Sequence, residues 1–235
     1  MTENVQSATV NLQGVSEIAV ATVSITAKIR VNLAVQHMLA AARFSREVGQ
    51  LEEQHRGEQF GEFWESILHH ATACVLTAVA SLEAYANELF TDRSSLFPAY
   101  SPELMNNLWE TYEQKPILQK FEFALLLLRK PVMDSGAGSY QDIKVLIDLR
   151  NALTHFKPEW LSEATEHAKV SAKLKPKIKG SPFLAESELL FPRRWSSHSC
   201  TSWAVNSAVA FANDFERLAG FSAKYVVANA AALEP

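Results

Sequence analysis

Glycine, proline and cysteine are all scarce in this sequence. There are 8 glycines and 9 prolines in 235 residues, so tight turns have few places to form and long helices are favoured. The two cysteines, Cys74 and Cys200, are too few for a disulfide framework. Thiols of this kind are typical of a reducing compartment, and we expect a cytoplasmic protein.

Long hydrophobic runs and a strong net charge are missing as well. The longest uncharged apolar run, ATACVLTAVASL at residues 71–82, is short and interrupted by Thr and Ser, so we expect no membrane span. The polar N-terminus, MTENVQSATVNLQG, is unlike a signal peptide. A formal net charge of −4 gives no general argument for binding nucleic acids or membranes.

Several common catalytic signatures are also absent. The sequence has no Gly-rich phosphate loop, nucleophile elbow, dinucleotide fingerprint or DNA-binding motif, which argues against kinases, hydrolases and dehydrogenases of the common folds. A metal site can be drawn only from residues far apart in sequence, namely His69, His70, Cys74, His198 and Cys200. Because no C-x-x-C or H-E-x-x-H spacing joins them, we expect no metal or cofactor, and we place Cys74 in the core.

Apolar residues recur at helical spacing along most of the sequence, and this pattern predicts an all-α helical bundle. We expect a disordered N-terminus over residues 1–14 and a single helical domain over 15–235. Two long helices are expected, at 16–48 and 60–90, and the second is apolar nearly all round, as a central helix would be. Shorter helices are expected at about 101–114, 116–130, 141–156, 159–174 and 201–220, with a small irregular or hairpin segment near 175–200.

Polar side chains interrupt the predicted helix QDIKVLIDLRNALTHF near its end. Arg150, Asn151 and His155 are costly to bury on such a helix, so they face either water or something that needs them. At about 100° per residue, Asp148 and Thr154 lie on the same half of the helix as these residues.

Two isoleucines share that polar half. A face turned only toward solvent has no need of Ile143 and Ile147, whereas a face packed against another helix or a second copy does. A two-fold axis near Asn151 would match this face with its own copy. We therefore expect a homodimer formed through this helix.

The run Arg150-Asn151-Ala152-Leu153-Thr154-His155 resembles the R-x(4–6)-H motif of the HEPN superfamily, which lies on a late helix of a bundle. The likeness extends to SLEAYANELF in the second long helix and to WAVNSAVAFANDFERL in the last one. The likeness covers most of residues 60–220, and this part of the chain is similar to bacterial HEPN-like proteins.

The resemblance implies a dimeric endoribonuclease that needs no metal, with a role in toxin–antitoxin or phage-defence biology and an antitoxin protein as a partner. In that scheme His155 handles protons, Arg150 holds the scissile phosphate of the RNA and Asn151 orients one or the other. Imidazole titrates near neutral pH and guanidinium matches phosphate, so the residue types suit this chemistry.

A second hypothesis is a non-catalytic helical interaction module in which the motif only joins two copies. A purely structural role also stays open, with Arg150 paired to a buried Glu and His155 at the negative end of its helix.

Further residues are candidates for supporting roles. Glu83 follows an apolar run with no cation nearby in sequence, so we expect it to contact Arg150 or another motif residue; an ordinary buried-pair or rim carboxylate is the alternative. Lys173, Lys175, Lys177 and Lys179 alternate with apolar residues, which in an extended chain gives one basic edge for an RNA backbone. The alternative is a solvated loop.

Overall fold

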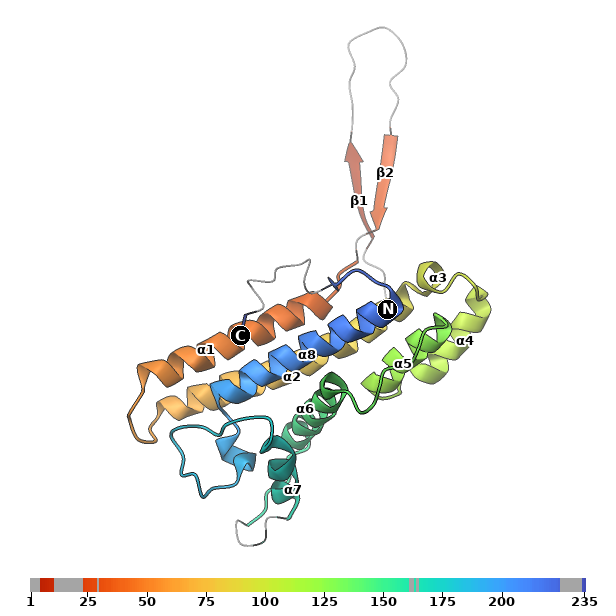
Figure 1. The fold of residues 1–235 in the computed structure, drawn as a ribbon. Coiled ribbons are helices and arrows are strands. Elements are labelled where there is room, and N and C mark those ends of the chain that lie inside the picture. The colour runs from red at the N-terminus through yellow and green to blue at the C-terminus, as the bar shows by residue number, and fades with distance from the viewer. Residues whose placement is uncertain (1–4, 11–22, 29, 161–162, 164, 225–233) are drawn as a thin grey trace. The chain divides into compact units, whose positions relative to one another are not determined.

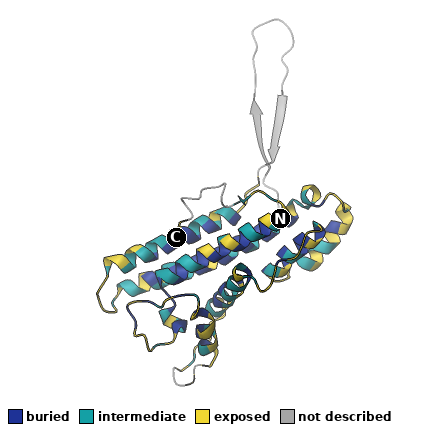
Figure 2. Cartoon of the chain, viewed as in Figure 1, coloured by how far each residue is buried: buried dark blue, intermediate teal, exposed yellow. Residues whose placement is uncertain are grey.

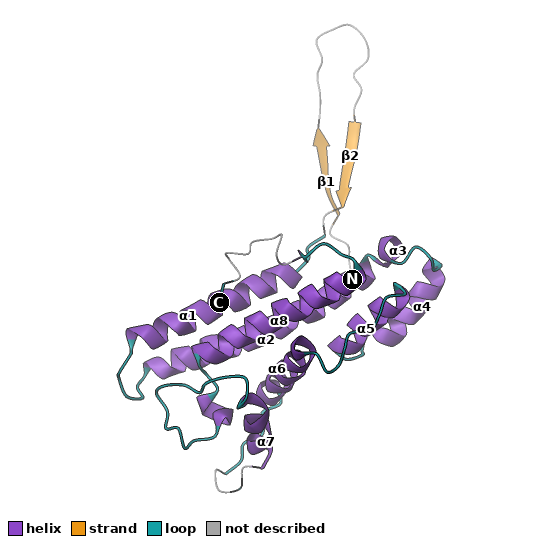
Figure 3. Cartoon of the chain, in the orientation of Figure 1, coloured by secondary structure: helices purple, strands orange, loops and turns teal. Residues whose placement is uncertain are grey.

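The computed structural model describes residues 5–10, 23–28, 30–160, 163, 165–224 and 234–235. The chain divides into two compact units, residues 1–32 and residues 33–235. The described residues of the second unit form a helical bundle, which confirms the predicted fold class. Figure 3 shows how far helices dominate this unit.

The first unit contains a two-stranded antiparallel hairpin. Strands β1 (Val5–Val10) and β2 (Val23–Lys28) pair so that Val5 lies opposite Lys28 and Val10 opposite Val23. The prediction of a helix is therefore wrong where β2 lies, and the predicted disorder of residues 1–14 stays a prediction. The sequence of β2, VSITAK, alternates apolar with polar residues and includes three β-branched ones, Val23, Ile25 and Thr26, which suits a strand better than a helix.

Three long helices form the centre of the second unit: α1 (Ala34–Gln54), α2 (Phe63–Thr91) and α8 (His198–Ala219). They run side by side in Figure 1, although α8 lies far from the other two in sequence. α1 begins at Ala34 and not near Ser16, because the β-branched run before it forms β2.

The helix α2 has the central place that its composition predicts. By length and hydropathy alone it is apolar enough to cross a membrane. It packs against α1, α8, α6 (Gly138–Thr154) and α5 (Ile117–Leu127), and 44% of its most apolar stretch is buried in these contacts. Figure 2 shows buried residues in dark blue, interleaved with teal ones, along the long helices of the bundle.

The remaining elements are short. They are α3 (Arg93–Leu96), α4 (Pro102–Tyr112), α7 (Thr165–Leu174) and a π-helical turn, η1 (Leu190–Arg194). Ser101 caps α4, because its Oγ accepts a hydrogen bond from the N–H of Leu104 at 3.3 Å. Gly220 ends α8 in the left-handed region, with φ of 79°. The segment near 175–200 is irregular and contains no strand among its residues, all of which the structure describes.

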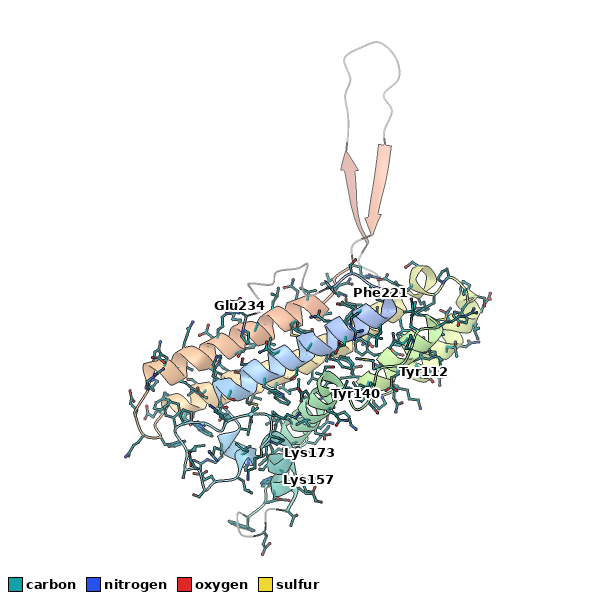
Figure 4. All side chains as sticks on the ribbon, in the orientation of Figure 1. Tyr112, Tyr140, Lys157, Lys173, Phe221 and Glu234 are labelled. Atoms are coloured by element: carbon teal, nitrogen blue, oxygen red, sulfur yellow. The ribbon has the colours of Figure 1, made fainter. Side chains whose placement is uncertain are left out.

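Aromatic side chains fill the space between α2, α5 and α8 and fix the position of α6. Phe121, Phe211 and Phe215 are fully buried, and their rings meet edge to face at centroid distances of 4.7 to 5.2 Å where Phe121 contacts the other two. Tyr140 of α6 lies on the rim of this cluster and donates a hydrogen bond of 2.5 Å to Glu122 (Figure 4).

The packing of α6 removes one ground for the predicted dimer. Ile143 is completely buried inside its own bundle, and Ile147 is partly buried and packs against the same core. α6 contacts α2, α8 and α7, so several helices cover its apolar residues. The expectation that Ile143 needs a second copy is wrong, because it rested on one packing partner for α6.

Candidate functional site

Two adjoining cavities run between α2, α6 and the start of α5, and we call them together the α6 groove. They share Glu83 and Arg150. The first, of about 430 Å³, is lined by Glu83, Gln114, Lys115, Pro116, Ile117, Leu118, Lys144, Ile147, Asp148, Arg150 and Asn151. The second, of about 350 Å³, is lined by His37, Leu76, Val79, Ala80, Glu83, Ala84, Asn87, Arg150 and Thr154.

The structure brings some of the predicted motif residues together and leaves one outside. Arg150, Asn151 and Ile147 line the first cavity, and Arg150 and Thr154 line the second. His155 lines neither cavity; it is exposed at the C-terminal cap of α6, where its backbone N–H donates to the Asn151 carbonyl oxygen at 2.9 Å.

Arg150 has an unused donor. The residue is half-buried, and its Nε is shielded from solvent without a hydrogen-bond partner among the described residues. A buried N–H without an acceptor is unfavourable by about 1–3 kcal/mol. Its backbone carbonyl, in contrast, accepts a hydrogen bond of 2.8 Å from the Thr154 hydroxyl. The guanidinium is therefore placed at the groove with a donor that an acidic ligand could satisfy.

Glu83 pairs with Lys120 of α5 and not with Arg150, so the predicted contact is wrong. Lys120 is only 2% exposed, and it also donates a hydrogen bond of 3.1 Å to Asn87. Its ammonium lies 5.7 Å from the centroid of the Trp109 ring. Lys120 thus neutralises Glu83 and leaves the guanidinium of Arg150 without that carboxylate.

The groove carries an excess of positive charge. Lys115 and Lys144 line its first cavity beside Arg150, and neither has an ion-pair partner among the described residues. Asp148 is the other carboxylate in that lining, and it pairs with Lys173 of α7 at 2.7 Å. Since both carboxylates are paired, the remaining cations give the groove a net attraction for anions.

The lysine-rich segment does not form the predicted basic strip. α7 continues to Leu174 and a turn follows, so Lys173 to Lys179 do not alternate as in an extended chain. Lys173 pairs with Asp148, and Lys177 pairs with Asp142 at 2.5 Å, both on α6; Figure 4 labels Lys173 at the end of α7. The prediction of a strip is wrong, because a turn at residues 175–177 follows α7 directly and two of the four lysines are paired with carboxylates of α6.

Sequence reasoning missed the cations that do line or support the groove. Lys144 lies seven residues before Asn151, two helical turns away and on the same face, so its position was available from periodicity. Lys115 and Lys120 gave no such signal, because their places depend on how α5 packs against α2 and α6.

The two cysteines are buried, and the prediction that Cys74 lies in the core is confirmed. The Cys74 thiol lies 3.7 Å from the carbonyl oxygen of Thr201. Burial raises the pKa of both thiols well above the usual range, so neither is a reactive thiolate near neutral pH. Among the described residues, no group of three or more His, Cys, Asp or Glu side chains is arranged to hold a metal ion.

Comparison of this chain with protein-family models, with curated proteins and with solved structures found no match.

Proposed function

We propose that this chain is a HEPN-like RNA-binding protein that cleaves RNA without a metal ion when two copies associate. The observation that carries the proposal is the guanidinium of Arg150, which has a buried, unpartnered Nε in a groove with the cations Lys115 and Lys144. A phosphodiester is a monoanion with two non-bridging oxygens, and it matches a forked guanidinium donor. The α6 groove would therefore hold the RNA backbone.

Cleavage needs two proton transfers besides phosphate binding. The 2′-oxygen of the ribose loses its proton and forms a bond to phosphorus, while the bond from phosphorus to the 5′-oxygen breaks and that oxygen gains a proton. The products are a 2′,3′-cyclic phosphate and a 5′-hydroxyl end. In this proposal the exposed imidazole of His155 accepts or donates the proton, and Arg150 offsets the charge on phosphorus.

One copy of the chain does not place these two groups together. Arg150 and His155 are five residues apart on or just after α6, which turns them about 140° from each other around the helix axis. A second copy would bring its own His155 to the Arg150 of the first. The composite site that the motif suggests therefore requires association.

Exposed aromatic residues next to His155 offer a surface for that association. Phe156 is 48% exposed and Trp160 is 80% exposed, and both follow His155 closely in the chain. Large exposed apolar side chains of this kind are common at protein interfaces. We therefore propose that Phe156 and Trp160 form the dimer contact. They replace the two isoleucines of α6 in this role.

The test is binding and cleavage of a fluorescein-labelled single-stranded RNA by the full chain in the presence of EDTA. Arg150→Ala should weaken binding about tenfold or more, since hydrogen bonds to charged groups contribute about 1.5–3 kcal/mol. Arg150→Lys keeps the charge but removes the Nε donor, so its affinity for RNA should fall between that of the wild type and that of Arg150→Ala. His155→Ala should abolish cleavage and leave binding nearly unchanged.

A matched control is Arg56→Ala, since Arg56 is a well-exposed arginine just after the end of α1, and its ion-pair partner among the described residues is Glu53. It should bind and cleave RNA as the wild type does. If Arg150→Ala and Arg56→Ala behave alike, the groove does not hold RNA. Cleavage that EDTA abolishes would contradict the metal-independent mechanism.

The second candidate is a non-catalytic helical interaction module, favoured by the exposure of Phe156 and Trp160. It predicts a dimer that neither binds nor cleaves RNA. The same RNA assay, together with the molar mass in solution, separates the two candidates.

A further inference from the structure

A cavity of about 690 Å³ lies beside α7 and η1, and it shares no lining residue with the α6 groove. Its volume falls within the range of small-molecule sites. Much of its lining is apolar: Ile178, Leu184 and Leu190 are each 8% exposed. The cavity can therefore bury a compact apolar group.

Two polar groups in the lining have unused donors. Ser181 is 1% exposed, and its Oγ has no hydrogen-bond partner among the described residues. The Nε of Arg194 is likewise buried and unpartnered. A buried polar group without a partner is unfavourable, so a ligand that accepts from both would relieve two such groups at once.

The chain fixes the guanidinium of Arg194 in this position. Its terminal nitrogen donates to the carbonyl oxygens of Glu186 and Glu188, at 2.9 and 3.3 Å. Its stem lies flat on Gly180, where an added Cβ would come within 2.7 Å of Nε. The backbone N–H of Ser181 donates to the Arg194 carbonyl oxygen at 2.7 Å, which ties the two residues together. These contacts hold the guanidinium of Arg194 and the backbone of Ser181 in the wall of the cavity.

Charges around the cavity favour a single negative charge on the ligand. Lys175, Lys179 and Arg194 line it together with the carboxylates of Glu186 and Glu188, so cations exceed carboxylates by one. A polyphosphate would meet the two carboxylates, whereas a monoanion would balance the lining.

We propose that this cavity binds a small organic monoanion with an apolar body, of the chemical class of a medium-chain carboxylate. The head group accepts hydrogen bonds from the hydroxyl of Ser181 and the Nε of Arg194, and the body lies on Ile178, Leu184 and Leu190. Lys175 and Lys179 draw the anion to the entrance. The proposal does not depend on the function proposed for the α6 groove.

The test uses the fluorescence of 8-anilinonaphthalene-1-sulfonate bound to the full chain and its displacement by sodium decanoate. 1-Decanol, with the same chain and no charge, is the matched ligand control. Wild type should bind the dye at one site and release it to decanoate at a concentration at least tenfold lower than to decanol.

Variants then assign the binding to the cavity. Ser181→Ala should weaken decanoate at least fivefold and decanol less than twofold, and Lys175→Gln with Lys179→Gln should do the same. The matched control Ser207→Ala removes a hydroxyl from a buried serine of α8 that does not line the cavity, and it should change nothing. Ala168→Phe should fill the cavity and abolish binding of both ligands.

Several outcomes would overturn the proposal. They are no dye binding by wild type, equal displacement by decanoate and decanol, or a decanoate affinity unaffected by the lysine pair. Circular dichroism checks that each variant is folded; if Ala168→Phe is not, the exposed lysine pair decides. Chain that binds phosphatidylglycerol vesicles but not decanoate would identify a lipid surface as the ligand instead.

Discussion

Among single residues, Glu216 shows how a buried carboxylate is tolerated inside this bundle. It is 1% exposed, and one of its oxygens accepts hydrogen bonds from the Tyr85 hydroxyl at 2.7 Å and from the Lys224 backbone N–H at 2.9 Å. Its other oxygen has no partner among the described residues. Burial raises the pKa of Glu216 above 4.5, because the charged form loses its hydration.

Glu216→Gln should change the pH dependence of stability. A raised pKa in the folded state means that the stabilising effect of the proton is complete below the unfolded value of 4.5 and is lost as pH rises through the folded value. The variant has no such loss, so its free energy of unfolding relative to wild type should increase from pH 4 to pH 7. Urea unfolding at both values measures this. A difference independent of pH would mean that Glu216 titrates normally in the folded state.

The buried ammonium of Lys120 predicts a coupling between Glu83 and the groove. Lys120→Met should reduce stability by about 2 kcal/mol, less than for a fully buried pair, because the Glu83 side chain is 38% exposed. It should also weaken RNA binding, since the released carboxylate lines both cavities with Arg150.

The double variant Lys120→Met with Glu83→Gln is the control for that coupling. It should regain most of the stability and of the RNA affinity, because no unpaired carboxylate remains beside Arg150. Urea unfolding and the RNA binding assay measure the two effects. If the double variant binds as weakly as the single one, Glu83 does not act on Arg150.

At this scale the sequence located part of the candidate site. Arg150 and Asn151 were singled out because they are costly on an apolar helix, and they do line a cavity. The partner of Glu83 could not be predicted from the sequence, since Lys120 lies 37 residues away in a different helix. The exposure of His155 also depends on how α6 ends against its neighbours, which a helical pattern does not specify.

Among the helices and strands, periodicity was reliable inside long apolar helices and unreliable at the N-terminal end. α2, α5 and α8 lie where apolar spacing predicted them. The residues of β2 have apolar positions that suit a period of two as well as a helix, so spacing alone could not decide. Their β-branched character is the feature of the sequence that favours a strand.

The helix α6 yields a packing prediction. Ile143→Ala should lower the free energy of unfolding by about 2–5 kcal/mol, because Ile143 is completely buried in its own bundle and the change leaves a cavity. The matched control is Leu126→Ala on α5, where the side chain is 62% exposed, and it should cost less than about 0.5 kcal/mol. Urea unfolding of monomeric protein at low concentration gives both values. Equal effects would place Ile143 at an interface instead.

For the whole molecule, the central prediction is association through Trp160. Light scattering at micromolar concentration should give about twice the chain mass of 26.1 kDa for wild type. Trp160→Ala removes a side chain that is 80% exposed, so it should shift the particle toward the monomer without lowering monomer stability. If the wild type is a monomer, Arg150 and His155 do not meet in one site and the proposed composite site is contradicted.

Mixing two inactive variants tests whether the site is shared between copies. If Arg150 of one chain works with His155 of the other, Arg150→Ala and His155→Ala form a heterodimer with one intact site. Random exchange would then restore about a quarter of the wild-type cleavage rate. No recovery after exchange, checked with differently labelled chains, would contradict a site built from one residue of each copy.

The position of α8 has a consequence for how this protein is made. Thr201 near the start of α8 accepts a hydrogen bond of 2.8 Å from Ser45 of α1, so the helix that completes the core is joined to the first helix of the bundle across 156 residues of chain. During synthesis, the apolar side of α2 that α8 covers stays open until residues 198–219 have left the ribosome. Contacts between segments so far apart form slowly. The nascent chain therefore exposes an aggregation-prone apolar surface for a long time. A chaperone that shields α2 during this time would raise the yield of folded protein.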